Sequence, residues 1–204
     1  MRACSRQHLS SVPHQEADVL VRNVVRATLA GTLTLVALLG GQAVAAPADS
    51  PRAAAPRVLT YDSSGSAEFA DAVDAGVQVW NESVTSVRLE KAGSGEQANV
   101  RIVADDGWPR AVTTSLGNGT VYFGREAVQQ GYDTTRIASH ELGHILGLPD
   151  MKPGPCSSLM SGSSAGVSCT NPNPDAAEKA EVEDNFGSGA AGAADRQGTL
   201  VFQD

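Results

Sequence analysis

Two histidines, a glutamate and an aspartate lie close together in the segment SHELGHILGLPDMKPGP, residues 139–155. On an α-helix, residues four positions apart share one face, so His140 and His144 present their imidazole nitrogens to one ion. Zn²⁺ binds neutral imidazole and takes three protein ligands where its fourth position holds water. Glu141 then lies beside the ion and is placed to accept a proton from that water. The spacing predicts a catalytic zinc centre.

The third ligand must be something other than histidine, because the remaining two histidines of the chain lie in its N-terminal segment. Gly147 permits a sharp turn and Pro149 cannot continue a helix, so the chain reverses and brings Asp150 back beneath the histidine pair. A carboxylate is an accepted zinc ligand, and we predict Asp150 in this role. The alternative third ligand is an acid of the last predicted helix: Glu178, Glu181 or Glu183.

The first 45 residues have the composition of a secretory signal. Arg22 and Arg26 precede an uncharged apolar run that ends in the small residues AVA at 43–45. A membrane anchor is the alternative, but the run is short for a span of about 20 apolar residues and no basic cluster follows it. We therefore predict that residues 1–45 are a signal and that the protein is secreted, with no stable membrane anchor.

The exported part of the chain is strongly acidic. Of 15 basic and 23 acidic residues, four and two lie in the predicted signal, which leaves a net charge of about −10. This charge argues against nucleic acid and anionic membranes as partners. Roughly 130 to 160 residues remain, enough for one domain with its own core, and we expect a monomer.

Cys156 and Cys169 are the two cysteines outside the predicted signal. In an oxidising compartment two cysteines most simply form one disulfide, here closing a loop rich in Gly and Ser. Zinc ligation by the pair is the alternative, although structural thiolate sites usually have more sulfurs and a closer spacing.

Hydrophobic patterns predict a small α/β (α+β) domain over residues 58–186, with a sheet covered by helices. A helix that Ser66 caps is expected to bury Phe69, Val73, Val77 and Trp80 on one stripe. We expect strands at 58–61, 87–92, 98–104, 110–116 and 120–124, the last two as a hairpin across GNG, and a final helix at 175–186.

Two segments flank the predicted domain. Residues 46–57 are rich in Pro and Ala, which is typical of a pro-segment or a linker. Residues 187–204 form a Gly/Ala-rich tail that we expect to be flexible, with a weak strand at TLVF as the exception.

Met160 lies ten residues beyond Asp150, in the segment CSSLMSG. A lone methionine is usually core filling, but the metzincin pattern places a methionine turn beneath the zinc ligands after the third of them. HELGHILGLPD followed by SSLMSG resembles the snapalysin family, the small secreted neutral metalloproteases of Streptomyces. The segments VLTYDSS, QVWNESV, YDTTRIASHELGH, GPCSSLMSG and SCTNPNPDAAE extend the resemblance over residues 58–186.

This resemblance implies a compact metzincin-like fold with a small mixed twisted sheet, an active-site helix, a Met-turn at Met160 and a C-terminal helix. It implies Glu141 as the catalytic acid/base and Cys156 with Cys169 as the family disulfide. The zinc ligands implied by the family are His140, His144 and Asp150.

The family resemblance also implies a calcium ion at Asp133 and Thr135, although Asp133 is equally well placed to begin a helix. The sequence departs from the family pattern at residues 151–153, where MKP stands and the family commonly has a tyrosine after the aspartate ligand. A phenol that would assist in the transition state is therefore not implied at this position. The tail beyond Gly187 is an addition to the pattern.

Together these features predict a secreted zinc endopeptidase that hydrolyses peptide bonds in extracellular proteins such as casein. Zinc lowers the pKa of its water to about 7, and Glu141 accepts that proton and delivers it to the leaving amine. The substrate is expected to lie as an extended strand against the edge strand RAVTTSL, residues 110–116.

Three other interpretations of the motif were weighed. They are a non-catalytic zinc-binding module, a serine or cysteine hydrolase that uses the same histidines, and a chance HExxH on a core-facing helix. A structural zinc site needs no base at Glu141 and closes the fourth coordination position, so the enzyme is favoured.

Overall fold

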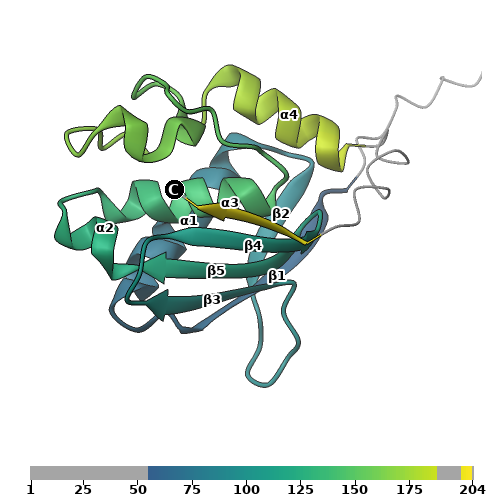
Figure 1. Ribbon diagram of the computed structural model, residues 1–204. Coiled ribbons are helices and arrows are strands. Elements are labelled where there is room, and N and C mark those ends of the chain that lie inside the picture. The colour runs from purple at the N-terminus through teal and green to yellow at the C-terminus, as the bar shows by residue number, and fades with distance from the viewer. Residues whose placement is uncertain (1–54, 188–198, 204) are drawn as a thin grey trace, which may run out of the picture. The chain divides into compact units, whose positions relative to one another are not determined.

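The computed structural model describes residues 55–187 and 199–203 (Figure 1). The predicted signal at 1–45 lies outside the described residues, as do most of the predicted pro-segment or linker at 46–57 and residues 188–198 of the predicted tail. Within the described ranges, no helix has the length and apolar character needed to cross a bilayer.

A mixed six-stranded sheet has the strand order β2-β1-β3-β5-β4-β6 (Figure 1). The pairs among β2, β1, β3 and β5 are parallel, whereas β4 pairs antiparallel with β5 on one side and with β6 on the other. The strands are β1 Arg57–Gly65, β2 Val87–Lys91, β3 Val100–Asp105, β4 Arg110–Ser115, β5 Asn118–Gly124 and β6 Leu200–Gln203. The mixed sheet and the predicted α/β class are confirmed.

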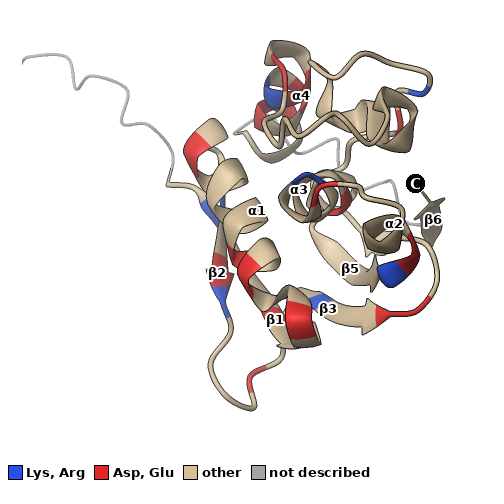
Figure 2. Cartoon of the chain, turned by 90° about the vertical axis from the view of Figure 1, so that its left-hand side faces the viewer, with Lys and Arg blue, Asp and Glu red and all other residues tan. Residues whose placement is uncertain are grey.

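The helices lie in two tiers above the sheet. In Figures 1 and 2, α3 lies between the strands and α4. The helical segments are η1 Ala67–Phe69, α1 Ala70–Ser83, α2 Arg125–Gln129, α3 Thr134–Ile145, η2 Leu159–Ala165 and α4 Ala176–Phe186. α2 and η2 were not predicted, because both are short and interrupt segments rich in turn residues.

The start of the first helix differs from the prediction. The Ser66 side chain does not cap it; its Oγ donates a hydrogen bond to the Ser63 carbonyl oxygen at 2.7 Å instead. The chain makes the 3-10 turn η1 before α1 begins at Ala70. The predicted cap is therefore wrong, because a nearby turn carbonyl satisfies the hydroxyl before the helix starts.

α1 packs closely against α3 and fixes the position of that helix. Val73, Val77 and Trp80 are buried on one stripe, as predicted. A Cβ on Gly76 would lie 2.8 Å from the Ala138 Cβ, so the two helices approach at a point where no side chain fits. The Trp80 Nε1 also donates a hydrogen bond to the Ser139 carbonyl oxygen at 2.8 Å. Packing against α1 and a buried hydrogen bond therefore fix the position of α3.

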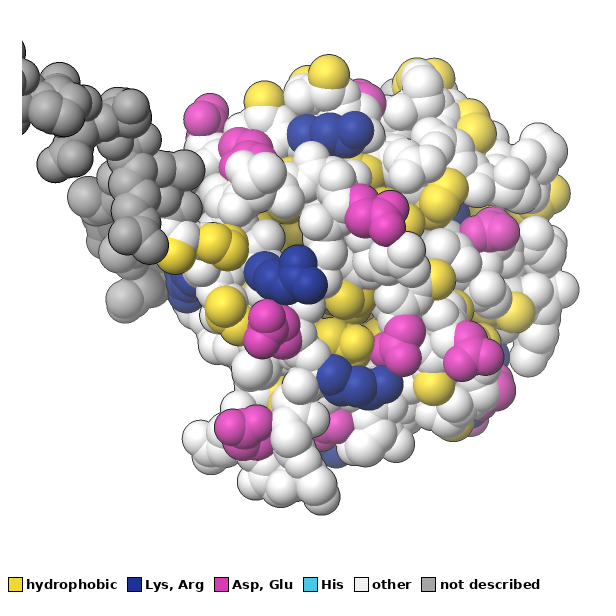
Figure 3. All heavy atoms as spheres, turned by 180° about the vertical axis from the view of Figure 1, so that it is seen from behind, with side chains coloured by type: hydrophobic (Ala, Val, Ile, Leu, Met, Phe, Trp, Pro, Cys, Tyr) yellow, Lys and Arg dark blue, Asp and Glu magenta, His cyan; other side chains and the backbone are white. Residues whose placement is uncertain are grey.

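The acidic residues of the first helical region lie on its solvent face. Glu68, Asp71, Asp74 and Glu82 are exposed, and Figure 2 marks the acidic positions of α1 in red. On the face shown in Figure 3, acidic and basic side chains are interspersed and no histidine is visible. These acids form a solvated surface.

Candidate metal centre

The ends of α3 determine where its side chains point. Asp133 caps the start, because its Oδ1 accepts a hydrogen bond from the Arg136 backbone N–H at 2.8 Å. At the other end Gly147 has a φ of 98°, in the left-handed region that favours glycine. The Leu148 N–H reaches back to the Gly143 carbonyl oxygen at 3.0 Å. This tight reversal returns the chain along the helix and places Asp150 below it.

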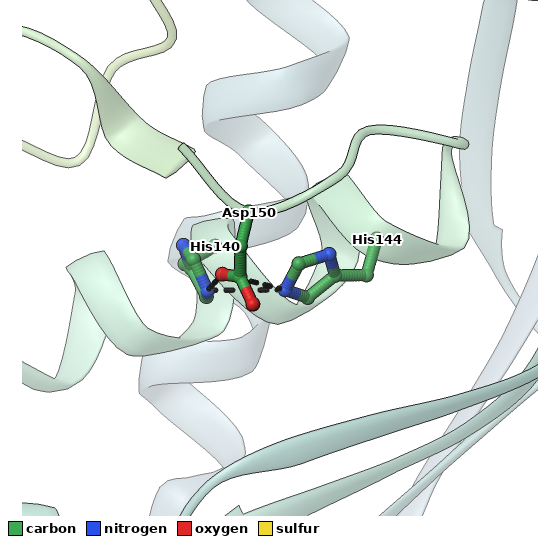
Figure 4. A group of neighbouring side chains, drawn as sticks. All are labelled: His140, His144 and Asp150. Carbon is green, nitrogen blue, oxygen red and sulfur yellow. Dashed lines mark hydrogen bonds and ion pairs between the residues drawn. The ribbon is translucent and has the colours of Figure 1, made fainter. Parts of the chain in front are cut away.

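His140, His144 and Asp150 converge (Figure 4). Their ligand atoms all lie within 4.8 Å of one another. The two Nε2 atoms are 3.1 Å apart, and the Asp150 Oδ1 lies 3.4 Å from Nε2 of His140 and 3.5 Å from Nε2 of His144. Both imidazoles are buried, whereas the aspartate side chain is 28% exposed. The donor group therefore lies at the protein surface with its histidines inside.

The tautomer of each histidine follows from its other nitrogen. His140 Nδ1 lies 3.0 Å from the Leu159 carbonyl oxygen, and His144 Nδ1 lies 2.8 Å from the Leu148 carbonyl oxygen. A carbonyl oxygen only accepts, so each Nδ1 carries the proton and each neutral ring turns an Nε2 lone pair toward Asp150. Three acceptors then face one another at short range. That arrangement is unfavourable alone and favourable around a cation.

The electrostatics of the site favour the same protonation states. Burial lowers the pKa of His144, which favours the neutral imidazole that a metal requires. Burial acts to raise the pKa of Asp150, but the hydrogen bonds that a proton on Nε2 of His140 or His144 would donate to it, together with the positive charge of Lys152, outweigh burial and hold that pKa well below its usual range. The residues therefore present two neutral imidazoles and one carboxylate.

These donors fit zinc in kind and in spacing. Two nitrogens bound to one tetrahedral Zn²⁺ at ordinary bond lengths lie about 3.3 Å apart, close to the 3.1 Å between the two Nε2 atoms. Two imidazoles and a carboxylate also form a donor set that zinc accepts at catalytic sites. The hydrogen bonds from each Nδ1 to a carbonyl oxygen orient the rings in the way that metal-binding histidines usually are.

Glu141 is fully buried on α3 between the two histidines in sequence. It does not belong to the group of converging donors. The pKa of Arg110 on β4 is raised, chiefly by its hydrogen bond to Asp105 and in small part by the charge of Glu141. Glu141 is therefore a buried carboxylate that directly follows His140 in the sequence and is not itself one of the converging donors.

The acids of α4 are engaged elsewhere, which removes the alternative third ligand. Glu178 accepts hydrogen bonds from the backbone N–H groups of Leu159 at 3.1 Å and Met160 at 2.8 Å. Glu183 accepts from the Ser86 backbone N–H at 3.0 Å, and Glu181 is exposed. Among the described residues, the structure therefore brings only Asp150 to the histidine pair as a carboxylate donor.

Arg136 and Glu178 hold the segment Leu159–Ser161, a role that the sequence analysis missed. Both side chains are buried. The Arg136 guanidinium donates to the carbonyl oxygens of Ser158 at 2.9 Å and Leu159 at 3.3 Å. Since His140 Nδ1 also bonds the Leu159 carbonyl oxygen, the arginine and the glutamate fix the peptide group that orients a metal-facing ring. The one feature of the sequence that could have indicated this role is the spacing of Arg136, which lies four residues before His140 and so on the same helical face.

Met160 is fully buried beneath α3, in the position that a Met-turn requires. A Cβ on Gly143 would lie 2.7 Å from the Met160 Sδ, so the helix and the methionine meet at a point with no room for a side chain. Cys156 and Cys169 form a disulfide across this loop, with their Cα atoms 5.5 Å apart. The predicted disulfide is therefore present, and the cysteine pair is not a zinc site.

Lys152 lies in the segment after Asp150 in which the family commonly has a tyrosine. Its Nζ is 3.2 Å from the Asp150 Oδ1 and donates to the Gln203 carbonyl oxygen at 3.3 Å. The Phe202 ring stacks on His144, with ring centroids 4.3 Å apart and planes 8° from parallel. The segment predicted as a weak strand at TLVF is β6, and it reaches the metal centre. Nothing in the sequence pattern linked this segment to the site.

The fold and the donor arrangement define a compact metzincin-like peptidase. More narrowly, the chain belongs to the Streptomyces extracellular neutral proteinase (M7) family, because a sequence model of that family matches residues 57–189. The expected family is thereby confirmed. A neutral proteinase family described as extracellular agrees with the predictions of a peptidase and of an extracellular protein, which are taken up below as proposals.

Curated relatives support the assignment, and each is called an extracellular small neutral protease. The protein of Streptomyces sp. (strain C5) is 40% identical over 149 residues, 73% of this chain and 65% of the relative. That of Streptomyces coelicolor is 42% identical over 147 residues, 70% of this chain and 67% of the relative. That of Streptomyces caespitosus is 42% identical over 124 residues, 61% of this chain and 92% of the relative. The match thus spans just under two thirds of the strain C5 protein.

Proposed function

We propose that this protein is a secreted zinc endopeptidase that hydrolyses peptide bonds in extracellular proteins. The observation that carries the proposal is the convergence of two lone-pair nitrogens, from His140 and His144, on the carboxylate of Asp150. Their spacing and protonation states suit zinc, and an acid without a place in the donor set lies next to them. Membership of a neutral proteinase family supports the same conclusion.

The residues of the chain divide the work among them. His140, His144 and Asp150 would hold the ion, and zinc when bound supplies a water of lowered pKa and a polarised substrate carbonyl. Glu141 accepts the proton of the attacking water and gives it to the leaving amine, so the same carboxylate acts first as base and then as acid. Burial of Glu141 keeps its carboxylate away from bulk water during that transfer.

The prediction that residues 110–116 form an edge strand is wrong for the described chain, because β4 pairs with β5 on one side and with β6 on the other. An extended protein segment remains the proposed substrate, bound along the side of β4 that β6 occupies in this structure. Backbone pairing at a sheet edge orients a peptide with little dependence on its side chains, so specificity must come from a pocket. The small pocket lined by Tyr132, Ile137 and Gly162, among others, has room for only about one water molecule, so it does not accept a substrate side chain as it stands. Casein, an open and readily cleaved protein, is a suitable test substrate.

Replacing Glu141 with glutamine tests the proposed proton carrier. We expect Glu141→Gln to keep its zinc and to lose about 10³-fold in kcat on casein, because the side chain keeps its shape but no longer accepts a proton. Glu126→Gln, at an exposed acid of α2, is the matched control and should retain full activity. Metal content is measured by atomic absorption. Zinc in every sample with no hydrolysis by any of them would favour the non-catalytic binding module.

Metal removal tests the proposed cofactor. Treatment with 1,10-phenanthroline should abolish casein hydrolysis, and one equivalent of Zn²⁺ should restore it. Activity that persists in metal-free protein would contradict the proposal.

Calcium binding at Asp133 and Thr135 stays a prediction. The Asp133 carboxylate caps α3, which accounts for this residue without a calcium ion. Calorimetric titration of the native chain and of Asp133→Asn with Ca²⁺ would test calcium binding separately.

A further inference from the structure

β6 occupies the edge of the sheet at which a peptide would have to bind. Its backbone pairs antiparallel with β4, joining Leu200 to Thr113, Val201 to Val112, Phe202 to Ala111 and Gln203 to Arg110. The other edge of β4 is taken by β5. A substrate that extends the sheet beside the metal centre therefore needs the same backbone groups of β4 that β6 uses.

β6 also contacts the metal centre itself. Phe202 stacks on His144 with ring centroids 4.3 Å apart, and the Gln203 carbonyl oxygen accepts a hydrogen bond from Lys152. Lys152 in turn pairs with Asp150 at 3.2 Å. The strand thus touches one proposed ligand directly and a second through a single side chain. A bound peptide would have to displace both contacts.

The contacts of β6 are few enough to be broken. It has four residues, and its Leu200 and Val201 side chains are 54% and 63% exposed. Main-chain pairing, one stacked ring and one lysine contact hold it. The family match ends at residue 189, so β6 is an addition to the part of the chain that the family shares.

We infer that residues 200–203 are a built-in competitor that occupies the substrate-binding edge of β4 and the rim of the metal centre until a protein substrate displaces it. The inference rests on the proposed peptidase function. A tethered segment competes at an effective concentration in the millimolar range for short linkers, so a weak strand is an effective inhibitor. Such competition raises KM by the reciprocal of the open fraction and leaves kcat unchanged.

The test compares full-length chains that differ only in β6. In one variant Leu200→Gly, Val201→Ser, Phe202→Gly and Gln203→Ser are combined, which removes the strand and keeps the chain length. We expect KM for a peptide substrate to fall about tenfold and kcat to stay within twofold, because the open fraction rises toward one. Phe202→Ala should give an intermediate KM. Val201→Thr, at an exposed and still β-branched position, is the matched control and should behave like the native chain.

A second measurement does not depend on catalysis. The synthetic peptide GTLVFQD, labelled with fluorescein, should bind the four-substitution variant about tenfold more tightly than the native chain, as followed by fluorescence anisotropy. An unchanged KM in an active, zinc-loaded variant would overturn the inference, and so would equal peptide binding by both chains. If no chain hydrolyses the substrate but the variant binds the peptide more tightly than the native chain, the proposed peptidase function is wrong and the occupation of the β4 edge by β6 is supported.

Discussion

The two sides of the metal centre are held in different ways. On one side the segment Leu159–Ser161 is fixed by the buried side chains of Arg136 and Glu178 and enclosed by a disulfide. On the other side β6 is held by backbone pairing, a stacked ring and Lys152, with two of its side chains mostly exposed. The ligand side is part of the folded core, whereas the β6 side is an attachment. Holding the ion and covering it are therefore separable properties.

The disulfide gives the largest expected effect on the ligand side. Replacing both Cys156 and Cys169 with serine should lower the free energy of unfolding by about 3 kcal/mol, because the bond closes a loop of about 14 residues and limits the unfolded chain. Urea unfolding of oxidised native protein and of the double variant measures this difference. The ratio of KM between chains with and without β6 should not change. A large change in that ratio would mean that the two sides are coupled.

Glu178→Gln should have the next largest effect. In the native chain the Glu178 carboxylate accepts hydrogen bonds from the backbone N–H groups of Leu159 and Met160. The glutamine side chain has one acceptor oxygen fewer, and its NH₂ group would face a backbone donor, which should lower the free energy of unfolding by about 2 kcal/mol. Zinc affinity should also fall, about tenfold, because the Leu159 carbonyl oxygen no longer holds His140 as firmly. Urea unfolding and competition with a zinc chelator give the two quantities. Glu181→Gln, on the exposed face of the same helix, should change neither, and equal effects from both would refute the assigned role.

Lys152 is the residue shared by the two sides, so its replacement sharpens the comparison. Lys152→Met removes a positive charge 3.2 Å from the Asp150 carboxylate. We expect zinc to bind about fivefold more tightly, a gain of about 1 kcal/mol, since a cation no longer competes for that carboxylate. KM should fall as well, because β6 loses a hydrogen bond. Lys152→Arg keeps the charge and should leave zinc affinity near the native value; weaker zinc binding by the methionine variant would contradict the prediction.

The smallest effect is expected at an exposed ion pair far from this network. The Arg125 guanidinium beside Glu68 lowers the pKa of that carboxyl to about 2. Because this pKa lies below the unfolded value, the pair stabilises the fold fully above about pH 4.5 and loses its effect as the pH falls toward 2. Glu68→Gln should lower Tm slightly at pH 7 and not at all near pH 2, as measured by calorimetry. A Tm difference that persists unchanged at pH 2 would exclude this ion pair as its cause.

The sequence predicted those features of the site that depend on residues close together in the chain, but not those that depend on distant residues. His140, His144 and Asp150 lie within eleven residues, so helical periodicity and the turn at Gly147 were enough to predict their convergence. The class of fold and most strands followed from alternating hydrophobic residues. These predictions succeeded because each depends on neighbours along the chain.

The missed features depend on partners that are distant in sequence. Glu178 bonds backbone N–H groups of Leu159 and Met160, and backbone groups leave no pattern in a sequence. β6 has four residues, too few for a clear period, and its partner β4 precedes it by more than 80 positions. Ser66 has the residue type of a helix cap but found a nearer acceptor in the Ser63 carbonyl. Side-chain type therefore predicted local chemistry, and the tertiary fold decided which partner was available.

The close approach of Gly143 to Met160 limits which sequences this architecture accepts. Of the two variable positions of the HExxH motif, Leu142 fills the core, while a Cβ on Gly143 would require the Met160 thioether to shift. A library that randomises both positions should therefore be enriched in glycine at the second one. The same constraint gives a search pattern for genomes, HE followed by an apolar residue, glycine and histidine, that is far more selective than the bare motif.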